Sequence, residues 1–346
     1  MNRICSSLSN AGYNVVLVGR KNNASPELIK KNFVQHRLFC YFSKGKIFYL
    51  EYNIRLFFYL LFNKTDAIVA IDLDSILPCL WVSQLKKTKR VYDAHELFCD
   101  MEEIVRRPMI YKIWKKIESY AVSKFKFGYT IGEFYAKEFH NNYNSTFEII
   151  RNATVFDEQN FQAKTGDYIL YQGAVNEGRG FEKLIPAMKN VNAKLIVCGN
   201  GNFFEQANDL VLKYKLDNKI EFKGYVDPIK LKEFTKNAKI GIAIFDNVGK
   251  SNVLSLANRF FDYMHFGVPQ LAMNYPEYQK INSEIEVALL LNELNEMELS
   301  NGLNLLINNY DYYQKLKMNC KEASKKYSWQ EEEKKLISFY NTLFEN

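Results

Sequence analysis

Residues 171–180 read Tyr-Gln-Gly-Ala-Val-Asn-Glu-Gly-Arg-Gly, and their surroundings give the clearest indication of the fold. A short apolar run, 167–172, leads into it, and a helical segment, 181–189, follows it. The pattern predicts a strand, a glycine-containing loop and a helix, which is the repeating unit of parallel α/β sheets. Glycines let the backbone approach a phosphate closely, and Arg179 stands where a guanidinium could pair with a diphosphate. The plainer alternative is a strand-to-helix turn with an exposed arginine.

The same alternation of short apolar runs and longer helical patterns continues on both sides. It predicts strands at 13–19, 33–39, 67–71, 89–92, 125–131, 148–151, 167–172, 193–198, 219–223, 239–245 and 269–273. Helical patterns at 46–63, 75–86, 103–123 and 133–141 separate the first of them. Such alternation favours parallel sheets joined by right-handed crossovers.

A polar stretch without clear period, 153–166, is the best boundary between two domains. We therefore expect a front domain at 1–152 and a back domain at 166–326, since 346 residues are too many for one ordinary α/β core. The last segment, 327–346, reads as a helix, and we expect it to pack back towards the front domain.

The net charge of +7 is unevenly placed. Residues 1–150 carry 22 Lys and Arg against 14 Asp and Glu, so the rest of the chain is nearly neutral. A basic front half suggests an anionic partner such as lipid headgroups, a lipid diphosphate or nucleic acid, although a generic solvated surface fits the charge equally well. No basic cluster matches a nucleic-acid reader motif, which disfavours that class. Six scattered cysteines without metal-like spacing indicate a reducing, cytoplasmic compartment.

The most apolar stretch, 54–62, is too short to span a bilayer. We expect it to be a helix packed on a sheet, with a helix at the cytoplasmic membrane face as the alternative because Lys44, Lys46, Arg55 and Lys64 surround it.

A second polar motif lies in the predicted helix of 256–267, where Asn258 and Asp262 stand one turn apart. A carboxylate there can accept hydrogen bonds from ribose hydroxyls, as acidic residues do in dinucleotide-binding folds.

Five stretches in order resemble the large retaining GT-B glycosyltransferase family that includes many bacterial polysaccharide enzymes. They are RVYDAHELF (90–98), YQGAVNEGRGFEKLI (171–185), LIVCGNGN (195–202), IEFKGYVDPIKLKEF (220–234) and LANRFFDYMHFGVPQLA (256–272). The resemblance implies a GT-B architecture: two Rossmann-like domains whose parallel sheets face a central cleft.

The resemblance also implies residue roles. Arg179 would bind the donor diphosphate, Asp262 the ribose, and His95 the donor sugar or the acceptor. The remaining donor-binding candidates are Gly173, Gly180, Gly199, Gly201, Tyr225, Val226, Asn258 and Arg259. No metal is implied, and the co-substrate would be a nucleotide-diphosphate sugar.

Three features depart from the family pattern. Ala174 stands where the family often has Arg, and Leu254 where it commonly has a first Glu. The chain opens at MNRICSSLSNAGYNVVLVGR (1–20), which resembles the family's first helix and second strand, so the expected first strand is absent. We expect a start at an internal Met, with a genuinely shortened chain as the alternative.

Asp72 and Asp74 form the D-x-D pattern that binds metal in another glycosyltransferase fold, but at the end of a parallel strand we expect them to cap it or line a cleft. His95, too, could be a satisfied turn residue. The expected function is transfer of a sugar, with retention, to a glycan or lipid-linked acceptor in cell-surface polysaccharide synthesis. The alternatives are a sugar-nucleotide epimerase and a catalytically silent nucleotide-sugar-binding protein.

Overall fold

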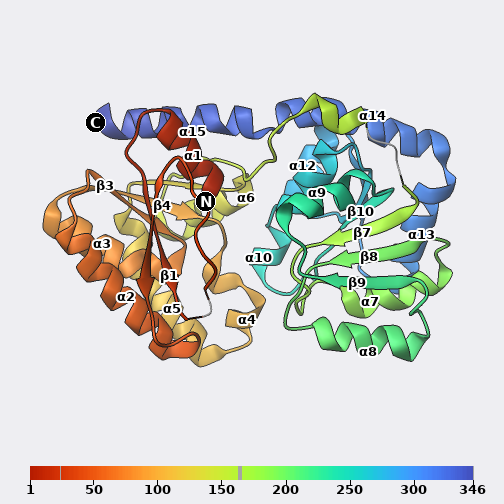
Figure 1. Cartoon of the computed structure of the whole chain (residues 1–346), viewed down its shortest axis with the longest axis horizontal. Coiled ribbons are helices and arrows are strands. Elements are labelled where there is room, and N and C mark those ends of the chain that lie inside the picture. The colour runs from red at the N-terminus through yellow and green to blue at the C-terminus, as the bar shows by residue number, and fades with distance from the viewer. Residues whose placement is uncertain (24, 163–165, 346) are drawn as a thin grey trace. The chain divides into compact units, whose positions relative to one another are not determined.

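The computed structural model describes residues 1–23, 25–162 and 166–345. The chain divides into two compact units, Met1–Arg151 with Glu332–Asn346, and Asn152–Glu331. Each unit is an α/β body (Figure 1).

The first unit contains two parallel sheets, one of β1 and β2 and one in the order β3-β4-β5-β6. Among the described strands β1 pairs with β2 only, and none of the residues of β1 is buried. The elements are α1 (Asn2–Asn10), β1 (Val16–Lys21), β2 (Val34–Phe39), α2 (Gly45–Phe62), β3 (Ala67–Ile71), α3 (Ile76–Lys86), β4 (Lys89–Ala94), α4 (Glu102–Val105), α5 (Pro108–Ala121), β5 (Phe127–Thr130), α6 (Glu133–Tyr143) and β6 (Glu148–Ile149).

The second unit contains one six-stranded sheet in the order β12-β11-β10-β7-β8-β9, with every neighbouring pair parallel. Its elements are β7 (Tyr168–Gln172), α7 (Phe181–Ala187), β8 (Lys194–Cys198), α8 (Phe204–Tyr214), β9 (Ile220–Gly224), α9 (Pro228–Lys236), β10 (Ile240–Ala243), α10 (Lys250–Val253), α11 (Asn258–His265), β11 (Gln270–Met273), α12 (Pro276–Glu284), β12 (Ala288–Leu291), α13 (Glu296–Asn308) and α14 (Tyr310–Lys326). The last helix, α15 (Trp329–Glu345), is shared between the two units.

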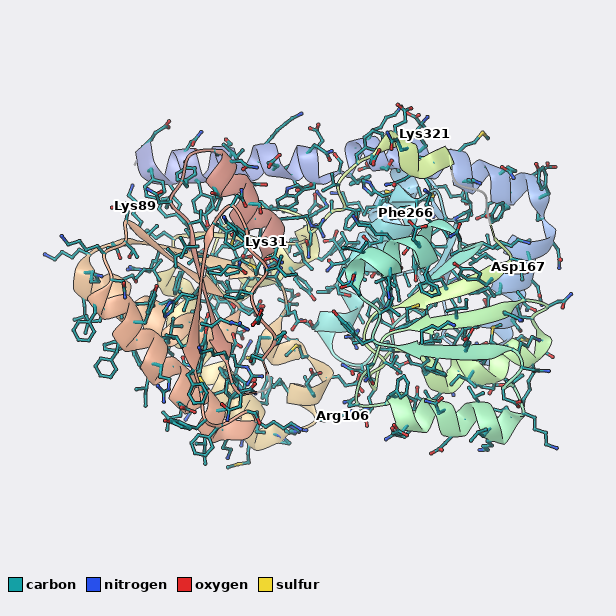
Figure 2. All side chains as sticks on the ribbon, viewed as in Figure 1. Lys31, Lys89, Arg106, Asp167, Phe266 and Lys321 are labelled. Carbon is teal, nitrogen blue, oxygen red and sulfur yellow. The ribbon has the colours of Figure 1, made fainter. Side chains whose placement is uncertain are left out.

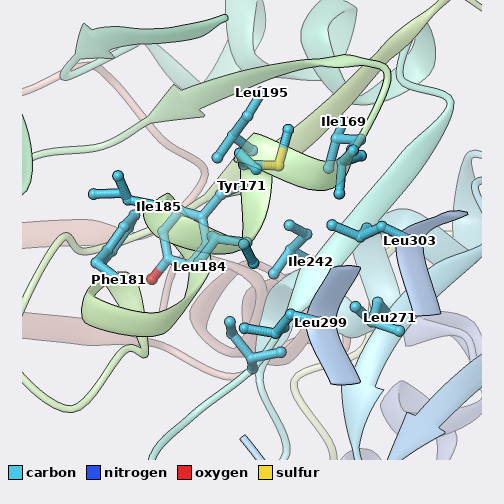
Figure 3. Packing of buried hydrophobic residues seen from close by; sticks show 14 of the residues in the cluster. Ile169, Tyr171, Phe181, Leu184, Ile185, Leu195, Ile242, Leu271, Leu299 and Leu303 are labelled. Carbon is cyan, nitrogen blue, oxygen red and sulfur yellow. The ribbon is translucent and has the colours of Figure 1, made fainter. Parts of the chain in front are cut away.

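Helices cover both faces of this sheet. One buried cluster joins the strands to α7, α8 and α13, and others join them to α9, α11 and α12. Figure 3 shows the first cluster, in which Tyr171 of β7 packs with Phe181 and Leu184 of α7. Burial of each such side chain stabilises the fold by roughly 1.5–3 kcal/mol, which explains why the strand β7, YILYQ, is apolar up to its last residue.

Helix α15 begins in the second unit, and its residues from Glu332 onward belong to the first. In the first unit Lys89, labelled in Figure 2, is hydrogen-bonded through Nζ to the carbonyl oxygen of Leu343. The ring of Phe339 packs edge-on against Tyr129 of β5, with centroids 5.3 Å apart. These contacts hold the end of α15 against the β4–β5 sheet.

No helix among the described residues has both the length and the apolar character that crossing a membrane requires. All six cysteines are buried and free.

Candidate functional site

The candidate site lies in the six-stranded sheet of the second unit, at the point where the order in which strands are added reverses. From the central pair β7 and β10, the chain moves outward through β8 and β9 on one side and through β11 and β12 on the other. In such doubly wound sheets, ligands bind at the carboxyl ends of the strands at this reversal point. The loops that follow β7 and β10 are therefore the ones to examine.

Glycines follow the strands at this edge and bring the backbone together. Gly173 N donates a hydrogen bond of 3.0 Å to the carbonyl oxygen of Cys198, and Gly199 N donates one of 2.8 Å to that of Gly224. A β-carbon on Gly199 would lie 1.7 Å from the carbonyl oxygen of Gly173. Gly199 thus serves the close approach of two strand ends, and no larger residue fits there.

The side chains of Asn176 and Asn202 join the loops after β7 and β8. Asn202 N donates to Asn176 Oδ1, and Glu177 N donates to Asn202 Oδ1, both at 3.0 Å. A β-carbon on Gly201 would lie 2.2 Å from Asn176 Oδ1. Gly201 therefore has a packing role in this junction, and its contact with a donor stays a prediction.

Two arginines share one aromatic ring beside these loops. The guanidinium carbon of Arg179 lies 4.7 Å from the ring centroid of Phe245, and that of Arg259 lies 4.4 Å from the same centroid. Arg179 is half-buried and donates from Nη1 to Asn252 Oδ1 at 3.3 Å. Stacking on one ring and hydrogen bonding hold two positive charges at the carboxyl ends of β7 and β10.

Arg259 is buried and also holds the strand ends together. Its Nη1 donates to the Tyr171 hydroxyl at 3.0 Å and to the Gln172 carbonyl at 3.3 Å, and its Nη2 donates to the Ile244 carbonyl at 3.1 Å. Because these partners belong to β7 and the segment after β10, Arg259 clamps the reversal point. Its Nε has no hydrogen-bond partner among the described residues. The predicted contact between Arg259 and a donor remains a prediction.

Asp262 is anchored on both carboxylate oxygens. Thr154 Oγ1 donates to Oδ1 at 2.5 Å, and Gln172 Nε2 donates to Oδ2 at 2.9 Å. The hydroxyl of Thr235 in turn donates to Gln172 Oε1 at 2.7 Å. These two bonds fix the orientation of the carboxylate.

The other predicted donor residues of the second unit lie at the same edge of the sheet. Gly180 adopts φ +74° at the start of α7, and Asn258 is the exposed first residue of α11. Tyr225 and Val226 follow directly after β9, and Tyr225 is 77% exposed.

His95 lies in the first unit, directly after β4. Its backbone N–H donates to Asp72 Oδ1 at 2.8 Å, and its Nε2 lies 3.0 Å from Asp93 Oδ1. Asp72 therefore accepts a backbone hydrogen bond at this strand end, in line with the expectation of local capping. Within the described ranges, no three His, Cys, Asp or Glu side chains converge as metal ligands would.

Several residues of these clusters were not singled out by sequence reasoning. Thr154, Gln172 and Phe245 support Asp262 and the two arginines in the second unit. The signal available for Gln172 was a polar residue at the end of an otherwise apolar buried strand. Thr154 gave no such signal, since it lies in the polar boundary stretch.

Comparison with known proteins places these features in a family. The family model described as glycosyl transferases group 1 matches residues 153–327. An uncharacterised glycosyltransferase of Methanocaldococcus jannaschii is 23% identical over 184 residues, which are 51% of this chain and 45% of that protein. The matched part thus spans about half the length of this curated relative.

Solved structures share the fold over most of the chain. A sucrose-phosphate synthase of Thermosynechococcus elongatus superposes with a TM-score of 0.81 at 16% identity, covering 99% of this chain and 92% of that one. A glycosyltransferase of Rickettsia africae has a TM-score of 0.72 at 13% identity, with coverages of 99% and 94%. HepE of Anabaena, solved in complex with UDP and glucose, has a TM-score of 0.71 at 11% identity, with coverages of 90% and 86%.

The two α/β units match the architecture expected from the sequence, and the family model matches the second unit. The fold is confirmed as GT-B, and the chain belongs to the glycosyl transferases group 1 family.

Proposed function

We propose that this protein transfers a sugar from a nucleotide-diphosphate sugar to a hydroxyl of a glycan or lipid-linked acceptor. The observation that carries the proposal is the pair of guanidinium groups on Phe245, beside the anchored carboxylate of Asp262 at the reversal point of the second sheet. Positive charges suit a diphosphate, and a carboxylate with a fixed orientation suits the hydroxyls of a ribose.

In the proposed reaction the bond between the anomeric carbon and the diphosphate oxygen breaks. A new bond forms between the anomeric carbon and the acceptor oxygen, whose proton passes to the departing diphosphate. Charge grows on the diphosphate during this step, and Arg179 stabilises it from a fixed position. We propose that the arginines supply the compensating positive charge. We also propose that the reaction proceeds with retention at the anomeric carbon, as the family resemblance implies.

The relatives suggest where to look for the donor. HepE was solved with UDP and glucose, so UDP-sugars are the first donors to test on this chain. We assign the acceptor to cell-surface polysaccharide synthesis, also by resemblance.

The test is a panel of nucleotide sugars screened by thermal shift, followed by transfer assays with and without acceptor. Arg179→Gln should lower transfer from the bound donor at least tenfold, while Lys183→Gln, which removes an exposed cation four residues further on, should leave transfer unchanged. Equal activity of Arg179→Gln and the unmodified protein would remove Arg179 from the mechanism. Conversion of the donor without acceptor would indicate an epimerase, and binding without any turnover a silent binding protein.

We also propose that the first unit contacts the cytoplasmic membrane face through α2. This helix buries Leu56 and Leu60 but leaves a stripe of apolar side chains 48% to 78% exposed. The stripe consists of Ile47, Leu50, Ile54, Phe58 and Phe62, spaced three or four residues apart. Lys44 and Lys46 at one end and Lys64 at the other suit anionic headgroups.

Vesicle sedimentation tests this contact. The protein should bind phosphatidylglycerol vesicles, and replacing Phe58 and Phe62 together by Ser should weaken binding at least tenfold. Leu212→Ser, a change at an exposed apolar residue of α8, is the matched control. Undiminished binding of the double variant would contradict the proposal.

A further inference from the structure

Polar side chains gather at the carboxyl ends of three neighbouring strands in the first unit. Asp72 follows β3, Asp93 and His95 lie at the end of β4, and Tyr129 lies in β5. Because β3, β4 and β5 are adjacent and parallel, these residues meet at one edge of the sheet.

Asp72 fixes the backbone of this cluster. Its own N–H donates to the Asp93 carbonyl at 2.9 Å, and its Oδ1 accepts from His95 N at 2.8 Å. Asp72 adopts φ +51° and ψ −179°, a conformation rare for a residue with a side chain. Such strain persists where surrounding contacts enforce it, and here two hydrogen bonds hold the segment from Asp93 to His95.

Asp93 fixes the imidazole ring of His95. Asp93 is 1% exposed; its Oδ1 lies 3.0 Å from His95 Nε2, and its Oδ2 accepts from the Tyr129 hydroxyl at 3.1 Å. Lone pairs on both atoms would repel at this distance, so the contact favours a proton on Nε2 when the ring is neutral. The nitrogen that gains and loses a proton is then Nδ1.

We propose that Asp93 is a positioning residue for His95: it holds the ring at Nε2 and leaves Nδ1 as the ring nitrogen available to a ligand oxygen. The part of this inference that concerns the ligand rests on the proposed function, in which the ligand is the donor sugar or acceptor. The part that concerns the ring does not.

The surrounding charges support a protonated ring. Burial by itself lowers the pKa of His95, but the charge and hydrogen bond of Asp93, with the charge of Asp72, outweigh it, and the pKa lies above its ordinary value. The α-amino group of Met1 acts in the opposite direction. Further titratable groups near the cluster are Glu96, which acts on Asp72, and Cys5, which lies in the field of Asp93. Tyr129 donates to Asp93, and its ring packs against that of Tyr340.

Nuclear magnetic resonance on the full chain tests the inference without any substrate. The sequence has four histidines, so the His95 signals can be assigned by their loss in His95→Gln. The ¹⁵N shifts of the neutral ring should show the proton on Nε2, and titration should give a pKa above 6.5. A neutral ring protonated on Nδ1 would overturn the inference, and this measurement needs no change at Asp93.

Variants then test the cause. Asp93→Asn should lower the ionisation midpoint of His95 by one pH unit or more, while Tyr129→Phe, which leaves the Asp93 charge in place, should shift it by much less. The signals of His36, His140 and His265 report whether each variant is folded. An unchanged His95 midpoint in folded Asp93→Asn would overturn the assignment.

A transfer assay separates this inference from the proposed function. With an active donor, Asp93→Asn should move the alkaline limb of the pH profile for kcat to lower pH, because the Nδ1 proton is lost earlier. No transfer with any donor, together with the expected ring titration, would reject the proposed function and leave the positioning of His95 standing. Transfer with a wild-type pH profile in Asp93→Asn would reject the positioning role alone.

Discussion

Gln172, the last residue of β7, donates a hydrogen bond of 2.9 Å from Nε2 to Asp262 Oδ2 in α11. The bond links the glycine-containing loop after β7 with the acidic residue predicted to bind ribose. Since Thr235 donates to the other end of the same amide, Gln172 holds the orientation of Asp262 from within the core.

Replacing Gln172 by Leu should therefore affect stability and donor binding together. The change leaves the Thr235 hydroxyl and one Asp262 oxygen without this partner, which costs roughly 1–3 kcal/mol of unfolding free energy. Urea denaturation and donor titration calorimetry measure the two effects. Thr235→Val, which removes only the outer link, should weaken donor binding less; equal donor affinity in Gln172→Leu and the unmodified protein would contradict this account of Asp262.

Replacing Gly199 by Ala should disrupt the edge of the second sheet. The added β-carbon would meet the Gly173 carbonyl oxygen at 1.7 Å, so one strand end must move, at a cost of roughly 3 kcal/mol. Gly19→Ala in β1 is the matched control, because a β-carbon there meets no atom within 4 Å, and its effect should stay within about 0.5 kcal/mol. Thermal unfolding of both variants gives the comparison, and similar melting temperatures would refute the close approach.

Arg259→Lys separates the clamp role of Arg259 from its charge. Lysine keeps the positive charge but cannot reach the Tyr171, Gln172 and Ile244 oxygens together, so unfolding free energy should fall by roughly 2–4 kcal/mol. Arg179→Lys should cost less in stability, about 1 kcal/mol, since Arg179 is only half-buried and its bond to Asn252 is 3.3 Å long. Urea denaturation of both variants gives the two unfolding free energies. A larger decrease for Arg179→Lys than for Arg259→Lys would contradict the structural role assigned to Arg259.

The first unit should lose stability as pH rises towards 7. Burial raises the pKa of Asp72 from 3.8 to about 7, so the folded state binds this proton more tightly than the unfolded chain. The contribution is fully present below pH 4 and disappears as pH rises through 7. The raised pKa of His95 acts in the same direction, because its contribution is lost above the folded pKa.

Asp72→Asn isolates this effect. Asparagine tolerates positive φ and can still accept the His95 N–H, but it does not titrate. Between pH 5 and pH 8 the variant should gain on the order of 2 kcal/mol relative to the unmodified protein, measured by urea unfolding at both values. Parallel stability curves would show that Asp72 is not the titrating group.

The strands of the second unit were predictable because local pattern reports burial. Apolar runs bounded by glycine at 167–172, 193–198 and 219–223 match β7, β8 and β9 to within one residue at each end. The run that forms β12 was missed, since a short apolar segment beside helical sequence has no period that separates a strand from a buried helix. The single helix expected at 103–123 is divided into α4 and α5, with Pro108 at the start of the second.

Sequence pattern also predicted that Arg179 and Asp262 lie near the carboxyl ends of the strands, because it gave the order of strand, loop and helix; their contact with a donor stays a prediction. The pattern could not reveal that Gln172 and Thr154 anchor Asp262, since those hydrogen bonds join residues 90 and 108 positions apart. Nor could it orient the His95 ring, which depends on the register of β3, β4 and β5. The apolar pattern and the backbone preferences of residues are local properties that can be read along a sequence. The partner of a buried polar atom depends instead on which strands become neighbours in the folded chain.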